Sequence, residues 1–407
     1  MSHLLIYDAD LSGHHCDYLN AVVDYVESSS PLYDPLSTIN FMLPAAYWQR
    51  RDDADTLRYI HRIDINPDTL KHRDSLSRHP RAMLEIELLT SVINTHQIDE
   101  LILMNLDYFQ LALASPLARR LNCRISGIQL QAYTRSELVA RESPWNISLW
   151  IVALRKRYRL QKMLKNVSIG RLLVPADTIA VDLLNERHAS SMQAIMLPEP
   201  YLPDVNDVDE IEQIDRCALR ARYSLEPGSR IILIFGRLIV RKNVENVIRA
   251  MQILDQKSNN KAVLLVVGKT CAPYQKKLRA LAQENPITQS SVRFDFDFVD
   301  DAVMHALFKA SDVVAMPYLK AFQSSGILFQ AVRYKKPVVT ANQGLINDLV
   351  QHYSLGKSVD PASPEQISEA IAQLLHTWTP SSGNQSLIDC HTAKNHAAVL
   401  LNQNVVV

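Results

Sequence analysis

Glycine and cysteine are scarce in this sequence, with 10 glycines and five cysteines in 407 residues. The cysteines are scattered and form no C-x-x-C pair, which argues against a structural zinc site and favours a reducing compartment. No predicted strand is followed by G-x-G-x-x-G, so the dinucleotide-binding fingerprint of a dehydrogenase is missing. A Rossmann dehydrogenase is therefore excluded.

Net charge and long apolar runs are also missing. Lys+Arg and Asp+Glu both number 43, so no general attraction to nucleic acid is expected. No segment reaches the roughly 18 apolar residues that a membrane helix needs. The N-terminal apolar run is too short for a signal peptide, and acidic residues follow it directly. We expect a cytoplasmic protein that meets a membrane, if at all, from its inner surface.

The length and the strand pattern predict two α/β domains. A chain of 407 residues is too long for one typical core, and Pro198, Pro200 and Pro203 with the acidic run 204–215 indicate a linker. After this linker, short apolar segments separated by helix-length stretches predict a doubly wound parallel sheet in the second half. The predicted strands are Leu4–Tyr7, Phe41–Leu43, Glu100–Met104, Ile125–Leu130, Ile231–Phe235, Val263–Val267, Val292–Phe298, Val313–Met316 and Val338–Thr340.

The stretch 312–339 combines a buried strand, a loop of small residues and a helix that begins near Ile327. The first backbone N–H groups of a helix are unpaired and lie at the positive end of its dipole. Ser324, Ser325 and Gly326 therefore predict a phosphate site at the carboxyl edge of a sheet. The alternative is an ordinary strand-to-helix turn capped by Ser324 or Ser325.

In the N-terminal half, polar residues follow three of the predicted strands. Gly13, His14 and His15 lie where a nucleotide or substrate would meet the sheet edge, although a solvated helix start explains them equally well. Asn105 and Asp107 follow the strand at 100–104, and Tyr133 follows the strand at 125–130. We assign His15, Asn105, Asp107 and Tyr133 to an acceptor side, and we interpret the stretch 48–81 as a mobile or acceptor-facing excursion.

A long helix is predicted after Pro144. Apolar residues mark one of its faces, and six basic residues with no acid lie between Arg155 and Lys165. This positive patch could meet anionic lipid headgroups or an anionic acceptor. A merely solvated surface is the alternative.

Three motifs in the second half occur in a consistent order: FGRLIVRKNVENVIRAM, LLVVGK, and RFDFDFVDDAVMHALFKASDVVAMPY followed by the small-residue loop. Over about 150 residues they resemble the donor-nucleotide domain of the retaining glycosyltransferases of family 4, which have the GT-B fold. The resemblance implies two Rossmann-like domains that face a central cleft. It implies an acceptor-side domain at 1–203, with a C-terminal helix in 384–407 packing back on it, and a donor domain at 204–383.

The resemblance also implies roles for individual residues. Arg237 and Lys242, near Gly236, match the family's diphosphate-binding pair. Their alternative is a surface ion pair with Glu245. Further matches are the phosphate-binding turn (Ser325, Gly326, Ile327), the loop that holds the base (Phe298, Val299), the ribose-binding position (Gln330) and a loop closing around donor and acceptor (Gly13, His14).

Fixed cations and helix-terminal N–H groups stabilise a diphosphate leaving group where charge develops, so no metal or other cofactor is expected. We interpret Asp295 and Asp297, which spell D-x-D, as structural. The family's Glu-x7-Glu motif is replaced here by Phe322 and Gln330. Gln330 can still bond a ribose through its amide.

The leading hypothesis is an enzyme that transfers a sugar, with retention, from a nucleotide-diphosphate sugar to a glycan, a lipid-linked saccharide or a small metabolite. Phe322 leaves open the alternative of a non-catalytic GT-B subunit that supports another transferase.

Overall fold

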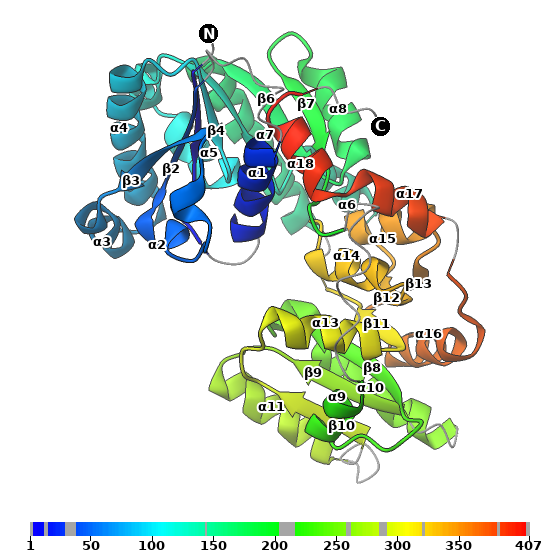
Figure 1. The fold of residues 1–407 in the computed structure, drawn as a ribbon. Coiled ribbons are helices and arrows are strands. Elements are labelled where there is room, and N and C mark those ends of the chain that lie inside the picture. Colours follow the sequence, from blue (N-terminus) through cyan, green and yellow to red (C-terminus); the bar gives the residue numbers. More distant parts are fainter. Residues whose placement is uncertain are drawn as a thin grey trace. The chain divides into compact units, whose positions relative to one another are not determined.

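The computed structural model describes residues 3–11, 15–28, 38–142, 145–202, 216–257, 262–284, 291–319, 322–380 and 383–403. The chain divides into two compact units (Figure 1). Unit 1 contains Met1–Pro200 and Ala393–Val407, and unit 2 contains Tyr201–Thr392. The acidic run at 204–215 that predicted a linker lies outside the described residues.

Unit 1 is built on a parallel sheet in the order β3-β2-β1-β4-β5-β6-β7. Its strands are β1 (His3–Tyr7), β2 (Thr38–Pro44), β3 (Ile60–Ile65), β4 (Glu100–Leu103), β5 (Arg124–Ile128), β6 (Ile169–Pro175) and β7 (Gln193–Leu197). The order reverses between β1 and β4, which pair in register from Leu4↔Glu100 to Tyr7↔Leu103. The loops after these two strands therefore leave in opposite directions and open a crevice at the sheet edge.

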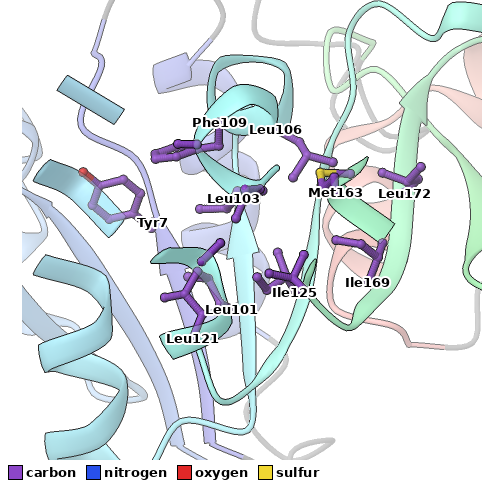
Figure 2. Close-up of a cluster of buried hydrophobic side chains, with 14 of the residues drawn as sticks. Tyr7, Leu101, Leu103, Leu106, Phe109, Leu121, Ile125, Met163, Ile169 and Leu172 are labelled. Carbon is purple, nitrogen blue, oxygen red and sulfur yellow. The ribbon is translucent and has the colours of Figure 1, made fainter. Parts of the chain in front are cut away.

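Helices cover this sheet and bury its apolar side chains. They are α1 (His15–Ser28), α2 (Ala45–Trp48), α3 (Pro67–Ser75), α4 (Arg78–His96), α5 (Leu106–Leu113), α6 (Tyr133–Glu142), α7 (Ile147–Asn166) and α8 (Thr178–His188), with 3-10 turns η2 (Ala54–Thr56) and η3 (Pro116–Arg120). Figure 2 shows part of the core, where Leu101 and Leu103 of β4 lie among side chains of neighbouring helices and strands. Tyr7 closes this core at the end of β1.

The stretch 48–81 is an ordered part of unit 1, so our interpretation of it as a mobile excursion is wrong. It forms η2, the edge strand β3 and α3. Charged residues alternate through β3, as an edge strand allows. Helix α3 has no buried residue, and Asn66 caps it by accepting a hydrogen bond from the Asp68 N–H, with Pro67 in its first turn. The capping residues of α3 indicate a helix in the sequence, whereas its apolar residues show no helical periodicity.

Unit 2 contains a second parallel sheet in the order β10-β9-β8-β11-β12-β13. Its strands are β8 (Arg230–Phe235), β9 (Ala262–Val267), β10 (Val292–Asp295), β11 (Val313–Met316), β12 (Val338–Ala341) and β13 (Gly356–Val359). The helices and 3-10 turn are α9 (Arg216–Arg222), η5 (Val240–Lys242), α10 (Val244–Lys257), α11 (Ala272–Gln283), α13 (Asp301–Ala310), α14 (Gly326–Arg333), α15 (Gly344–His352), α16 (Pro364–Thr377) and α17 (Gly383–Cys390). Both sheets are doubly wound, as predicted, and here the order reverses between β8 and β11.

The C-terminal segment forms two helices where the sequence pattern suggested one. Helix α17 ends at Cys390 and packs within unit 2 against α14, and α18 (Ala393–Leu400) packs against α1 in unit 1 (Figure 1). His396 of α18 is buried, and its Nδ1 lies 2.6 Å from the Pro198 carbonyl oxygen. Residues from both ends of unit 1 thus share one core.

Helix α7 presents its apolar stripe to solvent. The buried residues of this helix are Ala153, Leu160 and Met163, and the stripe around Leu154 and Tyr158 is exposed. Just before the helix, Trp145 is 95% exposed. Within the described ranges, no helix is both long enough and apolar enough to span a bilayer.

Candidate functional site

The switch point of the unit 2 sheet brings together most residues that the sequence assigned to the donor. Gly236 and Arg237 follow β8 directly, and the loop after β11 leads to α14. Gly236 has φ +93°, a conformation that favours glycine. A Cβ atom on Gly236 would lie 3.5 Å from Lys242 Nζ and 3.6 Å from Ile327 Cδ1. One backbone turn therefore sits between the Lys242 ammonium and the start of α14.

A second glycine allows this turn to form. Gly268 follows β9 and has φ +136°. A Cβ atom there would lie 2.1 Å from the carbonyl oxygen of Gly236, so any side chain at this position would clash with the backbone. The ends of β8 and β9 are thus in direct backbone contact.

Lys242 is a buried cation, 6% exposed, at the end of η5. Its Nζ donates hydrogen bonds to the Phe235 carbonyl oxygen (2.9 Å) and to the Tyr318 hydroxyl (2.8 Å). No carboxylate in the described part of the chain forms an ion pair with it. A buried ammonium without a counter-charge is costly, so this position favours an anionic ligand.

The alternative of an ion pair with Glu245 does not hold in the structure. Glu245 accepts hydrogen bonds from the Tyr274 hydroxyl at 2.6 Å and from Lys277 Nζ at 3.0 Å. Burial raises the pKa of the Glu245 carboxyl, but these two hydrogen bonds outweigh it and the net shift is downward. Glu245 is therefore ionised and bonded to Tyr274 and Lys277 of α11, and among the described residues it makes no ion pair with Lys242 or Arg237.

Arg237 is exposed and lines a cavity of about 730 Å³ at the carboxyl ends of β8 and β9. Two more cations, Lys269 and Lys277, lie in the same wall. The exposed apolar side chains of Ile239 and Val240 line it as well. The cavity thus combines positive charge with apolar surface, as a site for a charged ligand with an organic ring requires.

The N-terminus of α14 is not capped by a serine side chain. Ser325 is its N-cap residue and makes no capping hydrogen bond, and the buried Oγ of Ser324 has no partner in the described structure. The side-chain Oε1 of Gln330 is also without a hydrogen bond there, although Gln330 is only 8% exposed. These unsatisfied groups favour a phosphate-binding turn over an ordinary capped turn.

The loop after β10 has a shape that the sequence did not predict. Strand β10 ends at Asp295, three residues earlier than expected. Phe298 is 74% exposed, with Lys269 Nζ 5.3 Å from its ring centroid, whereas Val299 is buried. Phe322, in place of the family's first glutamate, is half-buried.

The D-x-D residue Asp295 is a structural group. Its carboxylate accepts hydrogen bonds from the Tyr223 hydroxyl (2.8 Å) and from Arg222 (3.2 Å). Among the described residues no cluster of three or more His, Cys, Asp or Glu side chains is placed to hold a metal ion.

The switch point of unit 1 forms a second cavity, of about 380 Å³, at the carboxyl ends of β1 and β4. His15 and Asn105 line it. His15 is buried, with Nδ1 2.5 Å from Asp8 Oδ2. Burial lowers the His15 pKa, but the hydrogen bond and charge of Asp8 raise it by more, so the net shift is upward. Gly13 and His14 lie outside the described residues.

The other two acceptor-side candidates do not line this cavity. Asp107 accepts hydrogen bonds from the Gln131 N–H (2.9 Å) and from Gln110 (3.0 Å), which hold the turn after β5. Tyr133 is fully buried, with its hydroxyl 3.0 Å from His188 Nε2. The structure therefore gives both side chains partners within unit 1.

Sequence reasoning missed several side chains at these two sites. In unit 2 it missed Tyr318, whose hydroxyl accepts a hydrogen bond from Lys242. Tyr318 is the last residue of the motif RFDFDFVDDAVMHALFKASDVVAMPY. In unit 1 it missed Arg73 of α3 and Arg78 and Arg81 in the first turn of α4, because all three lie in the stretch 48–81, which has no clean apolar period. It also missed Glu85, one turn further along α4. The cap signal at Asn66 could have revealed α3.

Comparison with known proteins supports the resemblance. Residues 215–386 match the family described as glycosyl transferases group 1. A GDP-mannose-dependent alpha-(1-6)-phosphatidylinositol monomannoside mannosyltransferase of Mycobacterium tuberculosis is 30% identical over 185 residues, covering 43% of this chain and 46% of that protein. The match thus spans about half the length of this relative.

Two solved structures show that the fold extends over the whole chain. A glycosyltransferase from Rickettsia africae matches with a TM-score of 0.67 at 13% identity, covering 98% of this chain and 97% of the other. The Anabaena protein HepE in complex with UDP matches with a TM-score of 0.56 at 16% identity, covering 99% and 95%. The chain therefore has the α/β fold of GT-B glycosyltransferases, with a doubly wound parallel sheet in each unit.

Proposed function

We propose that this chain, whose residues 215–386 match the glycosyl transferases of group 1, transfers a sugar from a nucleotide-diphosphate donor to an acceptor. The observation that carries the proposal is Lys242, a buried ammonium with no carboxylate partner among the described residues. It lies beside Gly236 and the uncapped N-terminus of α14. A diphosphate would supply the missing negative charge.

The proposed reaction breaks the bond between the anomeric carbon and the diphosphate oxygen and forms a bond from an acceptor hydroxyl oxygen to that carbon. The proton of the acceptor hydroxyl passes to the departing diphosphate. The leaving group gains negative charge as this bond breaks, and the Lys242 ammonium, the Arg237 guanidinium and the α14 N–H groups stabilise it most at that stage. These groups supply the positive charge that a divalent cation supplies elsewhere. Gln330, through its free Oε1, and the loop at Phe298 and Val299 are proposed to hold the ribose and the base.

Retention of the anomeric configuration belongs to this proposal and rests on the family resemblance. The acceptor is proposed to be a carbohydrate or a lipid-linked carbohydrate, as for the mycobacterial relative. Proton NMR of the first product formed would show the configuration, and an inverted anomer would contradict retention.

The experiment that tests the function is thermal unfolding of the full chain with a panel of nucleoside diphosphates and nucleotide sugars. A ligand at 100 times its Kd adds roughly 2.7 kcal/mol to the free energy of unfolding. We expect one nucleotide to raise the melting temperature clearly, with or without a chelator of divalent cations. No shift with any nucleotide would instead favour the non-catalytic partner subunit.

The exposed face of α7 is proposed to contact an anionic membrane surface. Ile147, Ile151, Leu154 and Tyr158 recur on one face of the helix and are all exposed. The exposed basic side chains beside them are Arg155, Arg157, Lys162 and Lys165. Lys156 is half-buried and donates a hydrogen bond to Ser136 at 3.1 Å, so it does not belong to this face. Apolar side chains next to positive charge are typical of helices that lie in the interface of an anionic bilayer.

Replacing both Leu154 and Tyr158 by serine tests this contact. The full chain is expected to sediment with vesicles of phosphatidylcholine and phosphatidylglycerol, and the double variant is expected to lose most of that binding. Ile179→Ser, at an exposed position of α8, serves as the matched control. Equal sedimentation with vesicles of phosphatidylcholine alone would contradict an electrostatic contribution.

A further inference from the structure

The cavity of unit 1 has a positively charged wall formed by the first turns of α4. Arg78 and Arg81 both line it, and neither forms an ion pair with a carboxylate in the part of the chain that the structure describes. Arg81 donates hydrogen bonds to the carbonyl oxygens of Arg73 (3.0 Å), Asp74 (3.2 Å) and Leu76 (3.1 Å). Backbone carbonyls therefore hold this guanidinium in place without neutralising its charge.

Arg78 is held in the same way. It donates a hydrogen bond to the Asp107 carbonyl oxygen at 3.1 Å, and its guanidinium lies 5.8 Å from the centroid of the Tyr108 ring. The N-cap residue of α4, Ser77, also lines the cavity and makes no side-chain capping hydrogen bond. The N–H groups of the first turn thus add positive potential to the same wall.

Three buried polar atoms of the cavity wall lack hydrogen-bond partners. The hydroxyls of Tyr7 and Tyr108 and the second carboxylate oxygen of Glu85 make no hydrogen bond with any described residue. The side chains of Tyr7 and Glu85 are each only 2% exposed. Burial raises the pKa of Tyr7 well above its usual range, so its hydroxyl stays protonated and can donate. The other oxygen of Glu85 is bonded to Arg73. The wall thus offers two hydroxyl donors, Tyr7 and Tyr108, and one carboxylate oxygen of Glu85 beside the arginines.

We propose that this cavity binds the acceptor of the proposed transfer through a phosphate ester. Arg78, Arg81 and the N-terminus of α4 bind the phosphate oxygens, and Tyr7 and Glu85 bind a hydroxyl of the attached polyol. The identification of the ligand as the acceptor rests on the proposed function, whereas the phosphate site itself does not. A phosphate monoester carries a charge of about −1.5 to −2 and three acceptor oxygens. It therefore suits two guanidinium groups that make no ion pair among the described residues better than a neutral sugar does.

The phosphate could be the monoester of a soluble metabolite or the diester of a lipid headgroup, which carries one negative charge and two free oxygens. The test therefore compares sn-glycerol 3-phosphate with glycerol, and the soluble short-chain lipid dihexanoyl phosphatidylglycerol with dihexanoyl phosphatidylcholine. Binding to the full chain is measured by calorimetry without nucleotide. We expect saturable binding of at least one phosphate probe and none of its neutral or zwitterionic counterpart, and the probe that binds more tightly identifies the source.

Variants assign the binding to this cavity. Arg78→Gln is expected to weaken binding of the probe about tenfold or more, because it removes a charge-assisted hydrogen bond. Tyr7→Phe is expected to weaken it several-fold without lowering the melting temperature, because it removes a hydroxyl that has no protein partner. Arg58→Gln, at an exposed position of unit 1 outside the cavity, is the matched control and should leave binding unchanged.

The donor site also attracts phosphate, so Lys242→Met is measured in parallel. Probe binding that survives Arg78→Gln and Tyr7→Phe but is lost in Lys242→Met would overturn the proposal, as would equal binding of glycerol. Thermal unfolding of Arg78→Gln with the nucleotide panel separates the proposed phosphate site of unit 1 from the proposed donor site of unit 2. A preserved nucleotide shift with no phosphate binding in the parent protein would reject this inference alone.

Discussion

Lys242→Met is expected to reduce release of nucleoside diphosphate from the donor sugar by 10²-fold or more. Loss of one group that stabilises developing charge has an effect on that order. Methionine fills nearly the same volume but cannot neutralise a diphosphate. The measurement is the rate of donor turnover in the presence and in the absence of an acceptor. The donor carries the nucleotide that thermal unfolding has identified.

The same substitution is expected to leave the unliganded protein as stable as the parent, or more stable. It removes a buried charge that has no ion-pair partner among the described residues, and with it two hydrogen bonds to Phe235 and Tyr318. The nucleotide-induced rise in melting temperature should be lost together with turnover. Lys276→Met, at an exposed position of α11, is the control. Unchanged turnover in Lys242→Met would refute the assignment of Lys242 to the diphosphate.

Arg237→Ala is expected to lower turnover by a similar factor, on the order of 10²-fold. Its side chain is exposed and makes no hydrogen bond or ion pair within the described residues, so its removal should not change the melting temperature of the free protein. Arg237→Lys should recover only part of the activity, because an ammonium cannot reproduce the two parallel hydrogen bonds of a guanidinium. These values are measured in the same donor-turnover assay.

The matched control for Arg237 is Arg249→Ala. Arg249 is an exposed arginine of α10 that donates a hydrogen bond to Asn246 Oδ1 at 2.8 Å. It should retain full activity. If Arg237→Ala were as active as Arg249→Ala, Arg237 would have no part in the reaction.

Most of the unit 2 sheet could be predicted from sequence because β8, β9, β11 and β12 are largely apolar runs. The polar edge strand β13, with the sequence GKSV, was not predicted. Strands such as β9 are buried along their whole length, and a glycine follows each of β8 and β9. In unit 1, β3 and α3 are surface elements that bury little apolar area, so periodicity gave no signal there. Helix α7 shows the opposite: its apolar periodicity predicted the helix, but the apolar face is exposed to solvent and does not pack against the core.

The candidate sites were predictable to different degrees. Motif order placed Gly236, Arg237 and the α14 turn at one sheet edge, and the structure places them there. No motif could show that Lys242 lacks a counter-charge or that Glu245 turns to Tyr274, because both facts depend on packing between helices far apart in sequence. The polar cavity of unit 1 likewise required coordinates for α3 and α4.

Helix α18 has a consequence for the order of synthesis. About 190 residues separate Pro200 from Ala393, yet both belong to unit 1. At 5–20 residues per second, the ribosome needs roughly 10 to 40 s to make that interval. During this time α1 lacks its partner, and the Tyr18 ring, which lies 4.6 Å from His396 in the finished protein, is uncovered. Unit 2 can complete its fold first, although its sequence comes second.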